Sequence, residues 1–418
     1  MEKKITADEK NYRVYALCAV GAEKVVSNEL KKLNFTIINS GYGKVCFHSS
    51  LAGLYRALIG LRAADRVLLE MACFSASDFD VLFKQSRAVH WEKIVPANLG
   101  FKVVKVRTNR SRLSAETSIQ SIVHKAAAQR LCNAYGMERL PETGSENTQA
   151  EARVYIEKDM VTLLLDLSGQ PLFKRGYRRA GGTAPLRETT AAALLLLSGW
   201  KRKYPLYDPF CGSGTILAEA LLYAWDMAPG LGRSFALESM IIADKGIENA
   251  VRDEFRSKIN FNRLIRIAGS DEDSVASDLA VSNLKRAQRL ALMQKQHHST
   301  DESGDPIPEN FPLMPEIKTL PMQKAYPDFT FSAEDSPAVS ADGFIVTNPP
   351  FGKRLGNEDL SQQVYREMPL LARNFSNWKF AVITGNSGFE HFFGKKANSC
   401  HEITGGPIKT YFFQYGKL

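Results

Sequence analysis

The sequence has few cysteines, and none of them is arranged to build a metal centre or a disulfide framework. Its 418 residues contain six scattered cysteines, with no Cys-x-x-Cys pair and no accompanying histidine cluster. This usage argues against structural zinc and against a disulfide framework, and it suits a reducing compartment. We therefore expect a cytoplasmic protein without a structural metal.

Long apolar runs are also missing. Residues 1–6 lack the apolar core of a signal peptide, and no run approaches the roughly 20 apolar residues that a membrane span needs. The apolar stretch 191–197 is too short to span a bilayer and is typical of a buried helix. The sequence therefore predicts a protein with no membrane partner.

An excess of acidic residues is absent as well. The chain carries 54 Lys and Arg residues against 45 Asp and Glu residues, which gives a formal net charge of +9. Such a balance favours an anionic partner without proving one. The length allows two or three domains and a substantial core.

The most informative motif is Asn348-Pro349-Pro350-Phe351, which follows the apolar run 344–346. Two prolines fix φ and remove two backbone donors, so the chain leaves a buried strand rigidly and with bare carbonyl groups. The Asn348 side-chain oxygen and the Pro349 carbonyl could accept the hydrogens of a planar amine, while Phe351 stacks on its ring. The alternative is an ordinary Pro-Pro turn with a core phenylalanine.

A glycine-rich turn is the second signal. The short strand 205–208 ends at Asp208 and is followed by Cys211, Gly212 and Gly214, and then by an apolar helix from 216. The glycines permit positive φ and close approach of a ligand to the helix N-terminus. The spacing matches neither the dinucleotide fingerprint nor a phosphate loop. A structural glycine turn is the competing interpretation.

Two further predicted strands end in acids. The run 264–270 precedes Asp271, and the run 329–331 precedes Glu334 and Asp335. In doubly wound folds such acids can hydrogen-bond ribose hydroxyl groups. Each acid alone could equally be a helix cap or a solvated charge. Four successive strand ends with a glycine turn, acids and the Asn-Pro-Pro-Phe motif favour one shared site.

Together these motifs resemble the S-adenosylmethionine-dependent amino-methyltransferases, and more narrowly the THUMP-domain RNA methylases that include the bacterial large-subunit ribosomal RNA guanine-N2 methyltransferases. The junction segments 166–169, 175–178 and 184–189 and the segment 228–235 support the narrower resemblance. It covers nearly the whole chain and is weakest across 290–328. The chain departs from the common pattern at Phe351, where tyrosine is frequent, and in the polar, proline-rich stretch 294–325.

The resemblance implies roles for individual residues. The methionine end of the cofactor would be lined by Asp208, Cys211, Gly212 and Gly214. Asp271 would hold the ribose, Asp335 would approach the adenine amine, and Glu188 and Thr189 would flank the cofactor. The target amine would be held by Asn348, Pro349, Pro350 and Phe351. We expect Cys211 to pack under the cofactor as a small residue, because no base is identifiable beside it.

The predicted fold is α/β, with a carboxy-terminal Rossmann-like, seven-stranded class I methyltransferase domain whose last strand is antiparallel. An α+β region precedes it. The predicted parts are a ferredoxin-like subdomain at 1–65, a THUMP RNA-binding domain at 66–168, a linker at 169–184 and the catalytic domain at 185–418, with a flexible insertion at 294–325. The oligomeric state is left open.

Basic residues cluster in two places. The strand 101–108 and the loop after it carry Lys102, Lys105, Arg107, Arg110 and Arg112, and the predicted linker carries Arg175 and Arg178. Strand alternation puts Lys105 and Arg107 on one face. We interpret these residues as phosphate contacts, with a solvated basic face as the alternative.

The sequence therefore predicts methyl transfer from S-adenosylmethionine to the exocyclic amine of a base in structured RNA, with guanine N2 of 23S ribosomal RNA favoured by the resemblance. A base in a helix would have to be turned out of its stack to react. Two alternatives remain open: a DNA adenine-N6 methyltransferase, and a non-catalytic RNA-binding assembly factor.

Overall fold

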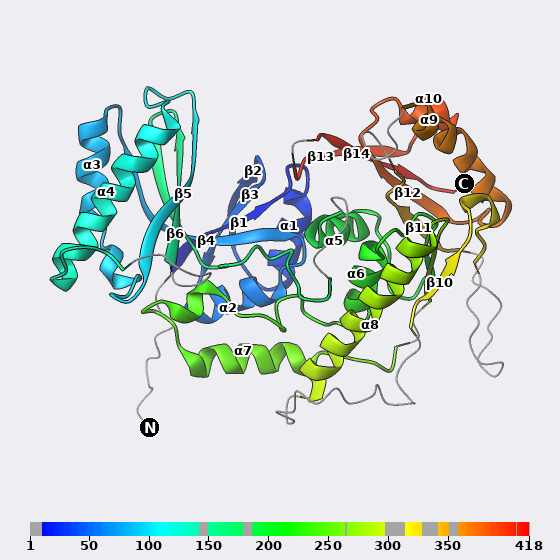
Figure 1. Ribbon diagram of the computed structural model, residues 1–418, viewed down its shortest axis with the longest axis horizontal. Coiled ribbons are helices and arrows are strands. Elements are labelled where there is room, and N and C mark those ends of the chain that lie inside the picture. The colour runs from blue at the N-terminus through cyan, green and yellow to red at the C-terminus, as the bar shows by residue number, and fades with distance from the viewer. Residues whose placement is uncertain are drawn as a thin grey trace. The chain divides into compact units, whose positions relative to one another are not determined.

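The computed structural model describes residues 11–141, 149–178, 186–263, 266–296, 314–327, 342–350, 358–406 and 408–417. The chain divides into two compact units. Unit 1 comprises Met1–Leu17, Ser27–Leu172 and Arg233–Arg252, and unit 2 comprises Cys18–Val26, Phe173–Gly232 and Asp253–Leu418. Each unit is built around a sheet of seven described strands (Figure 1).

The sheet of unit 1 mixes strands from both predicted amino-terminal subdomains. Its strands are β1 (Tyr12–Cys18), β2 (Ile37–Gly41), β3 (Lys44–Ser49), β4 (Ala64–Ser75), β5 (Gly100–Asn109), β6 (Gln149–Glu157) and β7 (Met160–Asp166), in the order β2-β3-β1-β4-β7-β6-β5. The helices along this part of the chain are α1 (Glu23–Lys32), α2 (Leu51–Gly60), α3 (Phe79–Ala88) and α4 (Glu116–Tyr135). Figure 1 shows α3 and α4 packed beside β5 and β6.

The predicted boundary between 1–65 and 66–168 falls inside β4, so this division of the chain stays a prediction. This strand pairs with β7 from Leu68 to Ser75. It also neighbours β1, whose Tyr15 hydroxyl group donates to the Glu70 carboxylate of β4 over 2.8 Å. The two predicted subdomains therefore share one continuous sheet. The predicted α+β character of this region is confirmed, and the strand predicted at 101–108 is β5.

The segment Arg233–Arg252 lies within the predicted catalytic domain but packs as part of unit 1. The Arg233 guanidinium donates to the Pro171 carbonyl over 2.7 Å, and the Asp244 amide donates to the Tyr55 hydroxyl group over 3.3 Å. These contacts join segments that lie far apart along the chain. Sequence order alone places the segment within the methyltransferase part and gives no sign of this packing.

Unit 2 contains the sheet predicted for the catalytic domain. Its strands are β8 (Leu206–Asp208), β9 (Ile267–Asp271), β10 (Glu316–Thr319), β11 (Phe344–Thr347), β12 (Lys379–Thr384), β13 (Ser399–Ile403) and β14 (Thr410–Tyr415), in the order β10-β9-β8-β11-β12-β14-β13. The pairs from β10 to β12 are parallel, whereas β14 is antiparallel to both its neighbours. The seven strands and the antiparallel last strand are confirmed.

Helices cover both faces of this sheet, as a buried parallel sheet requires. They are α5 (Glu188–Leu197), α6 (Thr215–Ala224), α8 (Ser274–Gln296), α9 (Glu358–Glu367) and α10 (Phe389–Phe393). Helix α7 (Lys245–Ser257) begins in the segment Arg233–Arg252 of unit 1 and ends in unit 2. Figure 1 shows α5, α6 and α8 together. On the other face, Tyr365, Phe375 and Phe389 pack against strand residues such as Ile345 and Phe380.

The flexible insertion predicted at 294–325 is wrong in part. Helix α8 continues to Gln296, and β10 pairs in parallel with β9 so that Glu316 faces Ala268 and Thr319 faces Asp271. The strand predicted at 329–331 lies outside the described residues. With the sequence Glu-Ile-Lys-Thr, β10 shows no buried apolar run, and its partner strand rather than its own pattern identifies it.

The longest described helices are α4 with 20 residues and α8 with 23. Both carry charged side chains along their length. Within the part of the chain that the structure describes, no helix is long and apolar enough to cross a membrane.

Candidate active site

A small cavity lies where β8 and β11 end in unit 2. These strands are parallel neighbours, with Ile345 opposite Tyr207, so the residues that follow them meet at one edge of the sheet. The cavity measures about 80 Å³ and is lined by Leu186, Asp208, Phe210, Cys211, Gly212, Ser213, Thr215, Ile216 and Asn348. We call it the strand-end pocket. It brings together the glycine turn and the Asn-Pro-Pro motif, which lie far apart in the sequence.

The glycine turn has the backbone conformation that its residues allow. Gly212 and Gly214 have φ values of 52° and 74°, and Gly214 caps the N-terminus of α6. A Cβ atom on Gly214 would lie 3.0 Å from the Cβ of Ala280, whereas one on Gly212 would meet nothing within 4 Å. Gly214 is therefore required for packing as well as for φ, and Gly212 leaves open space beside the pocket.

Asp208 is the acid among the described residues that line this pocket. Its side chain accepts hydrogen bonds from the Thr347 hydroxyl group at 2.6 Å and from the Phe210 amide at 3.2 Å. Burial raises the pKa of Asp208 to about 7, although these two bonds lower it; the charge of Asp271 raises it further. Because burial disfavours the charged form of Asp208, a cationic group placed beside it would stabilise the carboxylate.

Asp271 lies at the end of β9 and supports the glycine turn. One carboxylate oxygen accepts from the Gly212 amide at 2.8 Å, and the other accepts from the Asp273 amide at 3.1 Å. Each carboxylate oxygen can accept a second hydrogen bond. The predicted ribose contact is therefore compatible with this position and stays a prediction.

The side chain of Asn348 is the predicted acceptor of the motif, and its role toward an amine stays a prediction. Its Oδ1 atom is buried and has no hydrogen-bond partner among the described residues. A buried amide oxygen without a donor is costly unless a ligand supplies one. Phe351, Glu334 and Asp335 lie outside the described residues, so their predicted roles stay predictions.

Cys211 lines the pocket without being activated. Burial and the charges of Asp208 and Asp271 raise the pKa of its thiol well above the usual range. A thiol rather than a thiolate is therefore present at neutral pH, which does not favour nucleophilic catalysis.

The prediction that Arg175 and Arg178 contact RNA is not supported by their burial. Arg175 is 2% exposed and pairs with Glu219 at 3.3 Å. Arg178 donates to Thr215 at 2.5 Å, and its exposed fraction is only 17%. Both side chains are used inside unit 2, because buried acids and acceptors lie within reach of a segment that looks like a basic linker in the sequence.

Glu188 and Thr189 begin α5 and are buried, but they are not among the residues that line the strand-end pocket. Glu188 faces Arg178 at 3.6 Å. Burial raises the pKa of Glu188, and Arg178 partly offsets this increase. Their predicted place beside the cofactor stays a prediction.

Several residues at this site were missed by reasoning from the sequence. They are Leu186, Phe210, Ser213, Thr215 and Ile216, which line the pocket, and Thr347, which binds Asp208. The residues within or directly beside the glycine turn, which are Phe210, Ser213, Thr215 and Ile216, could have been found by extending that motif. Leu186 and Thr347 carry no signal of their own, because only folding places them there.

The predicted basic cluster of β5 is accessible in unit 1. Lys102, Arg107, Arg110 and Arg112 are exposed and Lys105 is half-buried. A register shift between Val103 and Lys105 changes the strand alternation, so Lys102 also lies off the buried face. The shift gathers more positive charge than simple alternation predicts, and RNA contact there stays a prediction.

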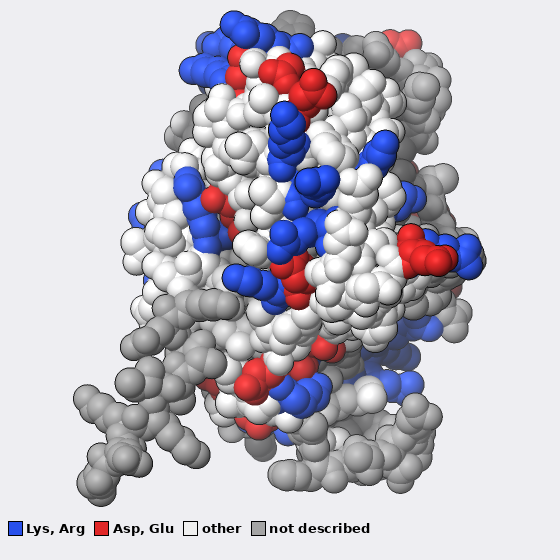
Figure 2. All heavy atoms as spheres, turned by 90° about the vertical axis from the view of Figure 1, so that its left-hand side faces the viewer, with Lys and Arg blue, Asp and Glu red and all other residues white. Residues whose placement is uncertain are grey.

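Basic side chains also gather on the face of unit 1 that carries α3 and α4. Figure 2 shows Lys and Arg side chains in a band on this face, interrupted by Asp and Glu. The exposed basic residues on these two helices include Lys84, Arg87 and Lys125. They are spread singly through the sequence, which is why no cluster is visible there.

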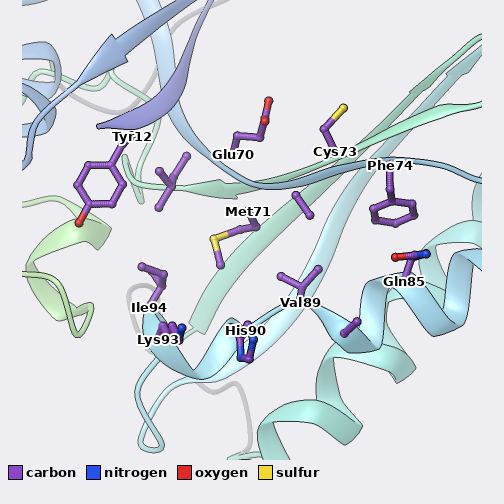
Figure 3. Close-up of a pocket in the computed structure, with 13 residues that line it drawn as sticks. Tyr12, Glu70, Met71, Cys73, Phe74, Gln85, Val89, His90, Lys93 and Ile94 are labelled. Carbon is purple, nitrogen blue, oxygen red and sulfur yellow. The ribbon is translucent and has the colours of Figure 1, made fainter. Parts of the chain in front are cut away.

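A larger cavity of about 460 Å³ lies in unit 1, between β4 and the segment after α3 (Figure 3). Met71 points into it, whereas Glu70 and Cys73 point to the opposite side of the strand. Glu70 accepts from Tyr15, and His90 contacts Glu92. With these charged groups already paired, the cavity offers no constellation comparable to the strand-end pocket.

The family comparisons match both units. Residues 175–305 and 329–412 match the family described as "RMKL-like, methyltransferase domain", and residues 13–68 match the RlmL ferredoxin-like domain. The first match includes the strand-end pocket, and the second includes β1 to β3.

Similar proteins extend along nearly the whole chain. The "Putative RNA methyltransferase YpsC" of Bacillus subtilis is 33% identical over 97% of this chain and 96% of its own length. The "Ribosomal RNA large subunit methyltransferase K/L" of Syntrophotalea carbinolica is 30% identical over 95% of this chain and 52% of its own length. The chain thus spans about half the length of the K/L relatives that it matches.

Solved structures give the same result. A possible methylase from Clostridium difficile 630 is 33% identical, with a TM-score of 0.81 over 98% of this chain and 99% of that one. The putative methyltransferase SMU.472, whose structure is a complex with SAH, is 28% identical, with a TM-score of 0.80 over 98% and 99% of the two chains. The chain therefore belongs to the RMKL-like family of S-adenosylmethionine-dependent methyltransferases and carries an RlmL ferredoxin-like domain.

Proposed function

We propose that this protein transfers a methyl group from S-adenosylmethionine to the exocyclic amine of a base in structured RNA, and that the base is guanine, methylated at N2, in 23S ribosomal RNA. The observation that carries the proposal is the buried Asn348 Oδ1 atom, which has no partner among the described residues and lies in the same pocket as Asp208 and the glycine turn. An amine of the substrate would satisfy it.

The chain's own residues fit the cofactor. Gly212 leaves open space beside the pocket, Asp208 offers a buried acid to an ammonium group, and Asp271 keeps acceptor capacity for hydroxyl groups. When bound, the cofactor supplies a methyl group that is already activated on a sulfonium. The protein therefore has to align the reacting groups and does not have to generate a strong nucleophile.

Asn348 and Pro349 would hold the target amine. The amide oxygen and the Pro349 carbonyl accept one amine hydrogen each and turn the nitrogen lone pair out of conjugation with the ring. The amine proton is then lost to solvent or through these two acceptors, so no residue is assigned as a general base. This role explains why an acceptor pair, and not an acid–base pair, follows β11.

RNA is the substrate class that the relatives favour. The Bacillus relative carries the name of an RNA methyltransferase, and the K/L relatives carry that of large-subunit ribosomal RNA methyltransferases. The net charge of +9 and the exposed basic residues of β5 suit an anionic polymer. A ribosomal substrate would place the protein in the cytoplasm.

A DNA adenine amine is the second candidate. One similar structure, 33% identical with a TM-score of 0.79, is described as that of a predicted N6-adenine-specific DNA methylase from Listeria monocytogenes. Guanine N2 and adenine N6 are both planar amines that an Asn-Pro-Pro site could accept. The RlmL ferredoxin-like domain at 13–68 favours the RNA substrate.

Transfer of label from tritiated S-adenosylmethionine tests the proposal. The protein is offered undermethylated total RNA and, separately, genomic DNA, and the products are digested to nucleosides. We expect label in N2-methylguanosine from ribosomal RNA. Label confined to methyladenine in DNA would establish the second candidate instead.

Calorimetric titration of the same preparation with S-adenosylmethionine tests the remaining alternative. Cofactor binding without transfer to free RNA would indicate that the substrate is a ribosomal assembly intermediate. Absence of cofactor binding would contradict the proposal and favour a non-catalytic RNA-binding protein.

A further inference from the structure

A buried cluster of charged side chains joins residues 175–178 to one face of α6. Thr215 and Glu219 are four positions apart on this helix, so their side chains lie on the same face. Arg175 and Tyr177 contact Glu219, and Arg178 contacts Thr215. The segment is therefore attached to α6 at two successive turns.

The contact at Glu219 is closed to solvent. Arg175 Nη1 lies 3.3 Å from one carboxylate oxygen, and the Tyr177 hydroxyl group donates to the other over 2.9 Å. All three residues are no more than 2% exposed. Burial, with the charges of Glu219 and Glu188, raises the pKa of Tyr177 well above its usual range, so the phenol keeps its proton and donates. This contact anchors the segment.

The contact at Arg178 reaches two other parts of the chain. Its Nη2 atom donates to Thr215 Oγ1 over 2.5 Å and to the Leu186 carbonyl over 2.8 Å. Its Nε atom lies 3.6 Å from a carboxylate oxygen of Glu188. One planar guanidinium group thus joins the start of α6 to the residues that lead into α5.

Leu186 and Thr215 are both walls of the strand-end pocket, whereas Arg178 is not among the residues that line it. We propose that Arg178 is a positioning residue, which holds these two walls at the spacing that S-adenosylmethionine requires. The inference rests on the proposed function, because it takes that cofactor as the ligand of the pocket.

Charge and burial argue against a direct contact of Arg178 with RNA. Glu188 offsets its charge, and Arg178 presents only 17% of its side chain to solvent. A lysine could keep the pairing with Glu188 but could not bond both Thr215 and Leu186 in the same planar arrangement. The Arg178→Lys variant therefore separates positioning from charge.

The test is calorimetric titration of S-adenosylmethionine into the full-length protein and its Arg178→Lys and Arg178→Ala variants, with melting curves for each. We expect the cofactor Kd to rise about tenfold or more in Arg178→Ala and less in Arg178→Lys, as for loss of a charge-assisted bond. The KM for S-adenosylmethionine should rise in Arg178→Ala. The kcat measured at saturating cofactor should change far less, because Arg178 touches no reacting atom. Lys174→Ala, at a neighbouring exposed position, is the control and should bind normally.

A double-mutant cycle with Thr215→Val keeps the test decisive even if Arg178→Ala does not fold. If Arg178 acts through Thr215, the Arg178→Lys substitution should weaken cofactor binding less in the Thr215→Val background than in the wild type. Strictly additive effects on Kd would contradict this link.

Two outcomes separate this inference from the proposed function. Unchanged cofactor Kd in folded Arg178→Lys and Arg178→Ala, with the wild type binding normally, would overturn the positioning role alone. A wild-type protein that does not bind the cofactor would overturn the proposed function and the inference together.

Discussion

The Thr347 hydroxyl group donates a hydrogen bond to the Asp208 carboxyl group over 2.6 Å. This bond joins the ends of β11 and β8, two parallel neighbours whose following residues form the strand-end pocket. Because Asp208 is buried and Asp271 is near, the pKa of Asp208 is about 7 even with this bond in place. The protonation of one carboxyl group therefore bears on both cofactor binding and stability.

We expect cofactor affinity to rise with pH through about 7. Deprotonated Asp208 attracts the ammonium group of S-adenosylmethionine and the protonated form does not, so affinity should change up to about tenfold per pH unit below the pKa. Titrations at about pH 6 and pH 8 measure the change. The Asp208→Asn variant is the control, because the cofactor's own ionisation affects both proteins equally while residue 208 ionises only in the wild type. An equal pH dependence of the Kd in both proteins would refute this expectation.

The stability of the cofactor-free protein should show the opposite trend. The folded-state pKa of Asp208 is above the ordinary value near 4, so its stabilising contribution is fully present below that value and is lost as pH rises through 7. The free energy of unfolding should fall by up to ~1.4 kcal/mol per pH unit over this window, relative to Asp208→Asn. Urea unfolding across the window measures it, and parallel curves would contradict the shifted pKa.

Replacing Asn348 with alanine should remove turnover while leaving cofactor binding nearly unchanged. The substitution deletes the buried acceptor that would hold the proposed target amine, and loss of such a preorganised partner costs about 10²–10³-fold in kcat. Single-turnover methyl transfer measures the loss, and calorimetry checks cofactor binding.

Asn386 offers a matched control for this substitution. It follows β12, the next strand of the sheet, and its side chain accepts from the Gly388 amide over 2.8 Å instead of facing the pocket. Asn386→Ala should keep its turnover. Similar losses in both variants would show that the effect comes from disturbing strand ends and not from the amine contact.

Removing Lys105, Arg107 and Arg110 together should weaken RNA binding and flatten its salt dependence. Each lost phosphate contact should reduce the slope of log K against log salt by about 0.7–0.9. The variant that removes Lys84, Arg87 and Lys125 on α3 and α4 loses the same charge and tests the other basic face. If only the second variant flattens the slope, RNA binds at the helical face and the β5 cluster is merely solvated.

Gly214→Ala should destabilise the protein more than Gly212→Ala. Both residues have positive φ, which costs an alanine roughly 1–2 kcal/mol. Only the new methyl group at Gly214 meets a neighbour, Ala280 at 3.0 Å, so overpacking should add about 1–3 kcal/mol. Denaturant melts of both variants measure the difference, and equal losses would mean that Ala280 yields without cost.

Much of the fold could be predicted from local patterns. The strand that ends at Asp208, the glycine turn and α6 follow one another along the chain, so periodicity and turn residues identify them. The strand before Asn348 is an apolar run ended by two prolines. The glycine turn and the Asn-Pro-Pro motif also predicted the centre of the candidate site, because residues that follow neighbouring parallel strands meet at one edge of the sheet.

Elements defined by a partner could not be predicted in this way. The polar strand β10 is recognisable only through its pairing with β9. Residues 233–252 lie within the methyltransferase part of the sequence but pack in unit 1. The burial and pairing of Arg175 and Arg178 could not be predicted for the same reason: a basic run looks solvated until the acids that face it are known.

The sequence by itself determined the two local motifs on which the proposed chemistry rests, because the Asn-Pro-Pro turn and the glycine turn require particular residues at neighbouring positions. The tertiary structure decided which distant residues contact those motifs. Thr347 reaches Asp208 and Arg178 reaches Thr215 and Leu186 only after the strands and helices have packed. Local backbone preferences act between neighbours in the sequence, whereas buried hydrogen bonds depend on groups that folding brings together.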